Sequence, residues 1–170
     1  ATTMVDKITG GIQLPTEVLE QIVTKTDGVP LFVEELTKTI LESGLLTEHL
    51  DQFVLSGPLP EVAIPATLHD SLMARLDRLG PVKEVAQIAA AIGREFSYDL
   101  LAAVSPLSSS ELQNALIQLI DTELVFRRGH SENGDYIFKH ALVQDAAYQS
   151  LLKSARLQIH ARIAETLEQH

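Results

Sequence analysis

Apolar residues recur every three or four positions along most of this chain, and this spacing predicts a succession of amphipathic helices. The first two predicted helices cover residues 14–26 and 30–43. The turn between them contains Gly28, which favours a tight turn, and Pro30, which suits the first position of a helix. Because this connection is short, we expect the two helices to form a helical hairpin.

Residues 45–65 break the pattern, because they contain three prolines and one glycine and keep no sustained apolar period. They predict a long connection with one short strand at residues 52–55. A helix at residues 67–79 follows, and its start resembles a capping box, since Asp70 lies three positions after Thr67.

The next part of the chain predicts a winged helix. Three helical segments, at residues 81–92, 97–104 and 109–122, come before two strand-like runs, at residues 124–128 and 136–139. A polar turn containing an Asn-Gly pair joins these two runs, so we expect a β-hairpin. Three helices followed by a hairpin is the order of elements in a winged helix.

Two more helices complete the pattern, one beginning at His140 and one at residues 154–168. The helix at residues 109–122 has a strong start signal, because Ser108 precedes Glu111 by three positions. The sequence therefore predicts a mainly α fold, in which a helical bundle is followed by a winged-helix domain with one small β-hairpin.

Composition narrows the classes of protein. Hydrophobic residues make up 45% of the chain, but no run approaches the roughly 20 apolar residues of a membrane span, so we expect a cytoplasmic protein without a membrane partner. The absence of cysteine excludes disulfides and fits a reducing compartment. The net charge of −10 is opposite to the basic footprint that nucleic acid attracts.

Known catalytic motifs are missing. None of the lysines follows a glycine, so the chain has no GxxxxGK[ST] loop for phosphates, and it has no HExxH, GxSxG or EF-hand pattern. The six histidines are scattered, which gives no metal site. Glu34 and Glu35 closely follow Pro30, where carboxylates favour the helix dipole, so we assign them a structural role. We predict no catalytic residue, no metal ligand and no enzyme activity of the chain alone.

His140 is the strongest candidate for a ligand contact, because it lies where a strand-like run gives way to an amphipathic helix. The first N–H groups of a helix lack intrahelical partners and the helix dipole is positive there, so a phosphate beside His140 would meet backbone and imidazole together. The alternative is a structural role for His140, as a helix cap or a half-buried packing residue.

The alternative function is a winged-helix DNA-binding module of a transcriptional regulator. A recognition helix at residues 109–122 should carry basic or amide side chains, but it has no Lys or Arg and includes two acidic residues. The basic residues cluster instead on the hairpin, where they either contact phosphates or form a solvated wing: Arg127, Arg128, His130 and Lys139. The charges therefore disfavour docking in a major groove.

Several blocks, in order, carry a resemblance to a known family: DGVPLFVEELTKTILESGLL, IPATLHDSLMARLDRL, AAAIGREFSYDLL and FKHALVQDAAYQSLL. They resemble the lid and winged-helix region of signal-transduction ATPases with numerous domains. The likeness is to bacterial multidomain proteins in which such an ATPase follows a class III adenylate/guanylate cyclase domain and precedes tetratricopeptide-like repeats. The resemblance covers roughly residues 12–170.

This resemblance implies roles for three residues. Gly28 and Pro30 match the GxP motif of the lid, whose proline packs against the base of the nucleotide. His140 matches the histidine of a Met-His-Asp motif, which contacts the β-phosphate of bound ADP and keeps the resting state closed. In this chain Lys139 and Ala141 replace the Met and the Asp, so only the histidine of that motif carries over.

The resemblance also implies an organisation and a function. Residues 1–13 would be a linker remnant of a preceding nucleotide-binding core, residues 14–80 the lid, residues 81–152 the winged helix, and residues 153–170 the start of a repeat region. The chain would be a non-catalytic regulatory arm of a nucleotide-switch ATPase, and its partners would be the nucleotide-binding core, the cyclase and the repeat domains of the same polypeptide. ADP or ATP would bind only in the full-length parent, and the isolated fragment would hold no cofactor.

Overall fold

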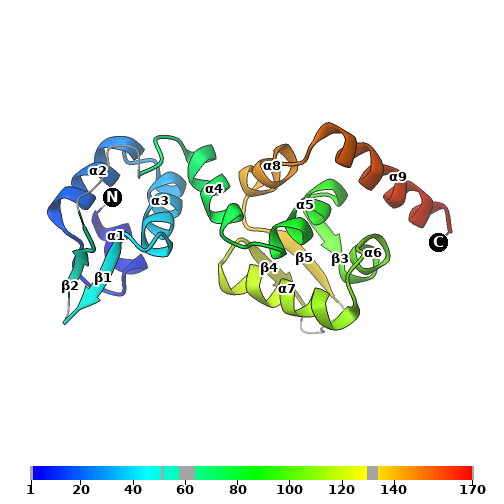
Figure 1. Cartoon of the computed structure of the whole chain (residues 1–170), viewed down its shortest axis with the longest axis horizontal. Coiled ribbons are helices and arrows are strands. Elements are labelled where there is room, and N and C mark those ends of the chain that lie inside the picture. The colour runs from blue at the N-terminus through cyan, green and yellow to red at the C-terminus, as the bar shows by residue number, and fades with distance from the viewer. Residues whose placement is uncertain (1, 51, 58–63, 130–133, 170) are drawn as a thin grey trace. The chain divides into compact units, whose positions relative to one another are not determined.

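The computed structural model describes residues 2–50, 52–57, 64–129 and 134–169, and 62% of it is helical (Figure 1). The few strands are short and antiparallel, which confirms the predicted mainly α fold. The chain divides into two compact units, residues 1–75 and 76–170. Within the described residues, no helix combines the length and the apolar character needed to cross a bilayer.

The first unit, coloured blue to green in Figure 1, is a small helical bundle with a hairpin. Its elements are α1 (Thr2–Ile8), α2 (Thr16–Thr26), α3 (Pro30–Glu42), β1 (Leu46–His49), β2 (Gln52–Leu55) and α4 (Leu68–Asp77), of which α4 runs past the end of the unit. The core is made by apolar residues at helical spacing: Val18, Ile22, Val33, Leu36 and Ile40 are at most 1% exposed. The two helices predicted on either side of Gly28 are confirmed.

Two features of the first unit were not predicted. Residues 2–8, in the segment interpreted as a linker, form α1, whose Val5 is buried in the same core. The connection at residues 45–65 contains two strands rather than one, since β1 and β2 pair as an antiparallel hairpin with Leu46 opposite Leu55. The first strand has no visible alternation because three of its four side chains are exposed. Residues 58–63 of this connection lie outside the described residues.

The second unit is a winged helix followed by two helices. Its elements are α5 (Val82–Ile92), β3 (Glu95–Ser97), α6 (Tyr98–Val104), α7 (Ser109–Asp121), β4 (Val125–Arg128), β5 (Asp135–Phe138), α8 (Ala141–Gln149) and α9 (Lys153–Gln169). The predicted hairpin is the pair β4 and β5, and β3 joins it to give an antiparallel sheet in the order β3-β5-β4. The sequence did not predict β3, because a three-residue strand is too short for an alternation to appear.

An aromatic cluster on one face of this sheet forms part of the core of the second unit. The ring of Phe96 stacks on Tyr136 at 5.7 Å between centroids and tilts against Phe138 at 5.5 Å. Each of the three residues is at most 3% exposed, and α5, α7 and α8 contact the strands. The opposite face is open, since Phe126 is 43% exposed. The alternation of buried and more exposed residues along β5 therefore orients the sheet.

Side-chain caps mark the starts of α4, α6, α7 and α8, whereas α2, α3 and α5 begin without a side-chain cap hydrogen bond. Ser108 accepts a hydrogen bond from the N–H of Glu111 at 3.2 Å and donates to its carboxylate at 2.9 Å, which confirms the predicted start of α7. Thr67 accepts from the N–H of Asp70 at 3.0 Å, as its sequence predicts for α4. Ser97 caps α6 in the same manner. Residues 130–133 of the hairpin turn lie outside the described residues.

We predict that Phe138→Ala destabilises the second unit by about 3–5 kcal/mol, because it removes a buried aromatic ring and leaves a cavity. Phe126→Ala is the matched control on the open face and should cost less than about 1 kcal/mol. All three tyrosines lie in the second unit, so tyrosine fluorescence during urea unfolding reports on this unit alone. Equal losses for the two variants would contradict this assignment of faces.

Candidate functional site

Gly28 and Pro30 lie together in the turn that ends α2 and begins α3. Asp27 and Gly28 have positive φ angles of 49° and 74°, which reverse the chain. A Cβ atom at Gly28 would meet no atom within 4 Å, so the backbone angle rather than lack of space favours glycine there. The N–H of Val29 donates to the carbonyl of Thr26 at 3.0 Å and closes the turn.

Pro30 occupies the first turn of α3, as predicted, and its ring is exposed. The N-cap, Val29, is 51% exposed beside it. A proline at this position costs no hydrogen bond, because the first N–H groups of a helix have no intrahelical partner. The turn therefore presents a small rigid apolar surface on the first unit, formed by Val29 and Pro30.

His140 is the N-cap of α8, two positions after the last residue of β5. Its backbone is extended, with φ −149° and ψ 151°, and its Nδ1 accepts a hydrogen bond from the N–H of Leu142 at 3.1 Å. The carbonyl of His140 also accepts from the N–H of Val143 at 3.0 Å. The residue is exposed, so the structural role considered from sequence is present as a cap rather than as core packing.

This cap determines which imidazole nitrogen faces a ligand. Because Nδ1 accepts a hydrogen bond, it carries no proton, so the proton of the neutral ring lies on Nε2. An N–H donor at Nε2 is then available to an anion next to the exposed start of α8, where the helix dipole is positive. Capping and anion contact use different atoms of the same ring. Gly28 and Pro30 belong to the first unit, and His140 belongs to the second.

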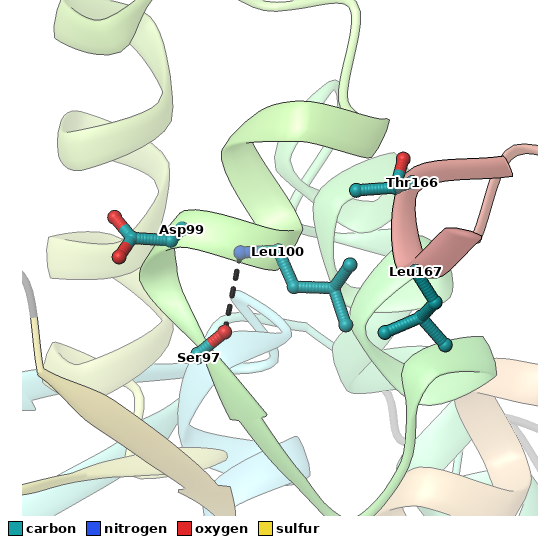
Figure 2. A pocket seen from close by; sticks show the side chains of 5 residues that line it. All are labelled: Ser97, Asp99, Leu100, Thr166 and Leu167. Atoms are coloured by element: carbon teal, nitrogen blue, oxygen red, sulfur yellow. Dashed lines mark hydrogen bonds between the residues drawn. The ribbon is translucent and has the colours of Figure 1, made fainter. Parts of the chain in front are cut away.

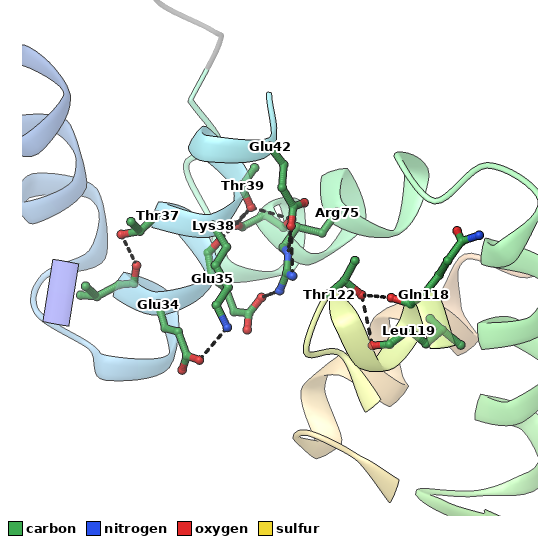
Figure 3. Close-up of polar contacts among 12 residues, drawn as sticks. Glu34, Glu35, Thr37, Lys38, Thr39, Glu42, Arg75, Gln118, Leu119 and Thr122 are labelled. Carbon is green, nitrogen blue, oxygen red and sulfur yellow. Dashed lines mark hydrogen bonds and ion pairs between the residues drawn. The ribbon is translucent and has the colours of Figure 1, made fainter. Parts of the chain in front are cut away.

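Sequence reasoning missed a buried ion-pair cluster in the first unit (Figure 3). Arg75 on α4 is 2% exposed and its guanidinium pairs with the carboxylates of Glu35 and Glu42 on α3. Glu35 is fully buried, and the contact of Arg75 with Glu42 measures 3.1 Å. Glu34 pairs with Lys38 one turn along α3 at 3.0 Å. Pairing with cations, rather than the helix dipole, accounts for both Glu34 and Glu35.

The guanidinium of Arg75 stays charged in this environment. Burial desolvates it and lowers its pKa, but the charges and hydrogen bonds of Glu35 and Glu42 outweigh burial, so the pKa of Arg75 is raised. The signal that reveals this cluster in the sequence is a polar stripe on each helix. Glu35 and Glu42 lie seven positions apart on one face of α3, and Ser71 and Arg75 lie four apart on α4.

A shallow groove lies between α7 and the hairpin of the second unit. A pocket of about 60 Å³ is lined by Gln113, Ile117, Arg127 and Tyr136, and the guanidinium carbon of Arg127 lies 5.8 Å from the centre of the Tyr136 ring. Arg128 forms an ion pair with Glu95 of β3. The predicted basic cluster is therefore partly engaged within the unit, and its member His130 lies outside the described residues.

A larger pocket of about 430 Å³ lies between α6 and α9 (Figure 2). Leu100 and Leu167 form its apolar wall, and Ser97, Asp99 and Thr166 provide polar atoms. The hydroxyl oxygen of Ser97 accepts a hydrogen bond from the N–H of Leu100 at 3.1 Å as the cap of α6. Among the described residues, no group of three or more His, Asp or Glu side chains is arranged to hold a metal ion. The pocket offers one carboxylate and an apolar wall.

Comparison with known proteins gives one informative similarity. No protein-family model matches the chain. The chain is 31% identical over 144 residues to an uncharacterized protein, R02095, of Rhizobium meliloti (strain 1021). The match covers 84% of this chain but 14% of that protein. Because 144 residues exceed the length of either unit, the similarity includes parts of both units within one much longer polypeptide.

We predict that His140→Ala destabilises the second unit by about 1 kcal/mol, because the N–H of Leu142 loses its side-chain acceptor. His140→Asn should retain most of the stability, since the amide oxygen of asparagine is a good N-cap acceptor. Urea unfolding followed by tyrosine fluorescence measures both variants. An unchanged midpoint for His140→Ala would mean that the cap contributes nothing.

Proposed function

We propose that this chain is the non-catalytic regulatory arm of a nucleotide-switch ATPase whose nucleotide-binding core lies elsewhere in a longer polypeptide. The first unit serves as the lid and the second as the winged helix. The observation that carries this proposal is that His140 caps the exposed start of α8 through Nδ1, which leaves its Nε2 to donate. The proposal rests on the family resemblance of the sequence, and the geometry of His140 supports it.

Each proposed contact matches a chemical feature of ADP. The β-phosphate is an anion, which suits an imidazole N–H beside the positive end of a helix. The base is a flat apolar surface, which suits the exposed ring of Pro30 and the neighbouring Val29. Gly28 permits the positive φ angle that sets the direction of this turn. Gly28, Pro30 and His140 are all binding residues, and none performs a chemical step.

The energies of these contacts explain why the arm requires a core. A hydrogen bond from His140 to a charged phosphate contributes about 1.5–3 kcal/mol. Apolar contact with Pro30 adds about 1 kcal/mol, whereas micromolar affinity requires about 8 kcal/mol. The core supplies the difference, and the arm responds to whether ADP or ATP is bound. Exchange of ADP for ATP releases His140 and permits the two units to rotate as rigid bodies.

The similarity to a segment of the longer Rhizobium meliloti protein supports an arm that acts within a multidomain polypeptide. In this proposal the arm relays the nucleotide state to a class III cyclase domain and to helical repeats of the same polypeptide, in the cytoplasm. The chain by itself catalyses no reaction.

The test uses the longer parent protein with its nucleotide-binding core. We predict that His140→Ala increases the rate of ADP dissociation by about 10-fold or more, which is the kinetic equivalent of losing about 1.5–3 kcal/mol. His140→Asn is the decisive control, because it keeps the cap of α8 but lacks the Nε2 donor, and it should release ADP as fast as His140→Ala. A stopped-flow chase of fluorescent ADP measures these rates. Wild-type dissociation in both variants would remove His140 from the mechanism.

The alternative, a DNA-binding winged helix, makes a different prediction. We expect no mobility shift of a random DNA duplex at low salt, because α7 carries no Lys or Arg and Arg128 is paired with Glu95. Arg127→Ala serves as a comparison, since Arg127 is an exposed cation beside the groove of α7. A shift that weakens steeply with salt and is lost in Arg127→Ala would favour the alternative.

A further inference from the structure

A buried polar seam joins α3 and α4 within the first unit. Helix α3 contributes Glu35, Thr39 and Glu42, at spacings of four and three residues, and α4 contributes Ser71 and Arg75, four residues apart. The hydroxyls of Thr39 and Ser71 lie 2.6 Å apart, and the hydroxyl of Thr39 lies 2.7 Å from the carbonyl of Glu35 and 3.2 Å from that of Ser71. We call these five residues the polar clamp. Four of them are at most 2% exposed, and the side chain of Glu42 is 32% exposed.

The polar clamp permits only one register between the two helices. The hydrophobic effect is non-directional, so an apolar seam does not by itself select one register as strictly as paired charges do. In the clamp, a shift would separate the Arg75 guanidinium from Glu35 and leave two buried charges without partners. A shifted docking of α4 on α3 is therefore strongly disfavoured. The raised pKa of Arg75 agrees with a charge that persists while the helices are docked.

The boundary between the two units falls inside α4, between Arg75 and Leu76, although the helix continues to Asp77. A bend there would break the main-chain hydrogen bonds of an intact helix. Just beyond Asp77 the chain enters a turn at residues 78–81, in which Gly80 has a φ angle of 60° and open space around it. The hydrogen bond from the N–H of Gly80 to the carbonyl of Asp77 is long, at 3.5 Å. The regular hydrogen bonding of α4 thus ends before this turn, whose other main-chain hydrogen bonds include one of 3.0 Å from the N–H of Lys83 to the carbonyl of Gly80.

We propose that the polar clamp makes α4 a rigid extension of α3, so that any rotation between the two units takes place in the turn at residues 78–81. Hinges commonly consist of a few loop or element-terminal residues that absorb changes of φ and ψ. An exposed ion pair between Asp77 and Lys83 spans this turn and contributes little resistance. The inference concerns where the chain bends and holds whether or not the parent binds a nucleotide.

Distances between spin labels on the intact chain test this inference. The chain has no cysteine, so two introduced cysteines are the only labelling sites. One pair, Gln21→Cys with Asp70→Cys, joins exposed positions of α2 and α4 within the first unit. The other pair, Gln21→Cys with Asn114→Cys, joins the first unit to α7 across the turn. We expect the first distance distribution to be narrow and the second to be at least twice as wide.

Substitutions then separate the clamp from the turn. Arg75→Met should widen the distribution of the first pair, and Glu42→Gln, which removes the charge of the part-exposed partner, should give a smaller widening. Glu34→Gln is the matched control, because it removes a carboxylate of α3 that pairs with Lys38 outside the polar clamp, and it should leave the first pair unchanged. Gly80→Ala should alter the distribution of the second pair alone, because a positive φ angle is strained for alanine. If circular dichroism shows that Arg75→Met unfolds the first unit, the comparison of Glu42→Gln with Glu34→Gln decides whether the polar clamp holds α4 in place.

Two outcomes would overturn the proposal. One is a second pair as narrow as the first in the otherwise unchanged chain, since no rotation would then occur at the turn. The other is a first pair that neither Arg75→Met nor Glu42→Gln widens while the first unit stays folded, because α4 would then be held without the polar clamp.

Discussion

A guanidinium buried between two helices must be neutralised where it lies, and this requirement organises the first unit. Arg75 meets Glu35 and Glu42 on α3, and Thr39 and Ser71 complete the seam. Such a cluster adds little net stability compared with apolar packing of the same volume, because the loss of hydration offsets the attraction. Instead, the cluster raises the free energy of arrangements of α3 and α4 that would leave the buried charge of Arg75 unpaired. With the polar clamp acting as proposed, the first unit can be small and still hold α4 in a single position.

His140 combines two uses of one side chain in the second unit. A histidine that caps a helix through Nδ1 has its ring orientation fixed by the backbone, and its Nε2 is directed elsewhere. Ligand-binding histidines are commonly oriented by a second hydrogen bond on the other nitrogen. In this chain the second bond comes from the N–H of Leu142, so α8 itself orients the ring. A structural role and a ligand contact are thus compatible.

The sequence predicted those elements whose signal is local. Apolar spacing located α2, α3 and the helices of the second unit, and the cap residue Ser108 located the start of α7. It did not predict β1 or β3, because short or exposed strands show no alternation. It also missed Arg75, since the pairing of two polar stripes depends on which helices become neighbours. The places of Gly28, Pro30 and His140 within their own units were predictable, because turns and caps are local. Whether they share one ligand depends on the arrangement of two units, which no local pattern encodes.

The clamp and the proposed contact of His140 are connected through the energy available for switching. One contact to a phosphate changes a conformational equilibrium by a factor of about 10 to 150, corresponding to about 1.5–3 kcal/mol. A compliant helix between the units would absorb part of this energy by bending, and the displacement would not reach the other unit. A rigid α4 followed by a short turn at Gly80 confines the movement to a few backbone angles. A small binding energy can then produce a large rotation, so under the proposed function a single histidine is sufficient as the sensing contact.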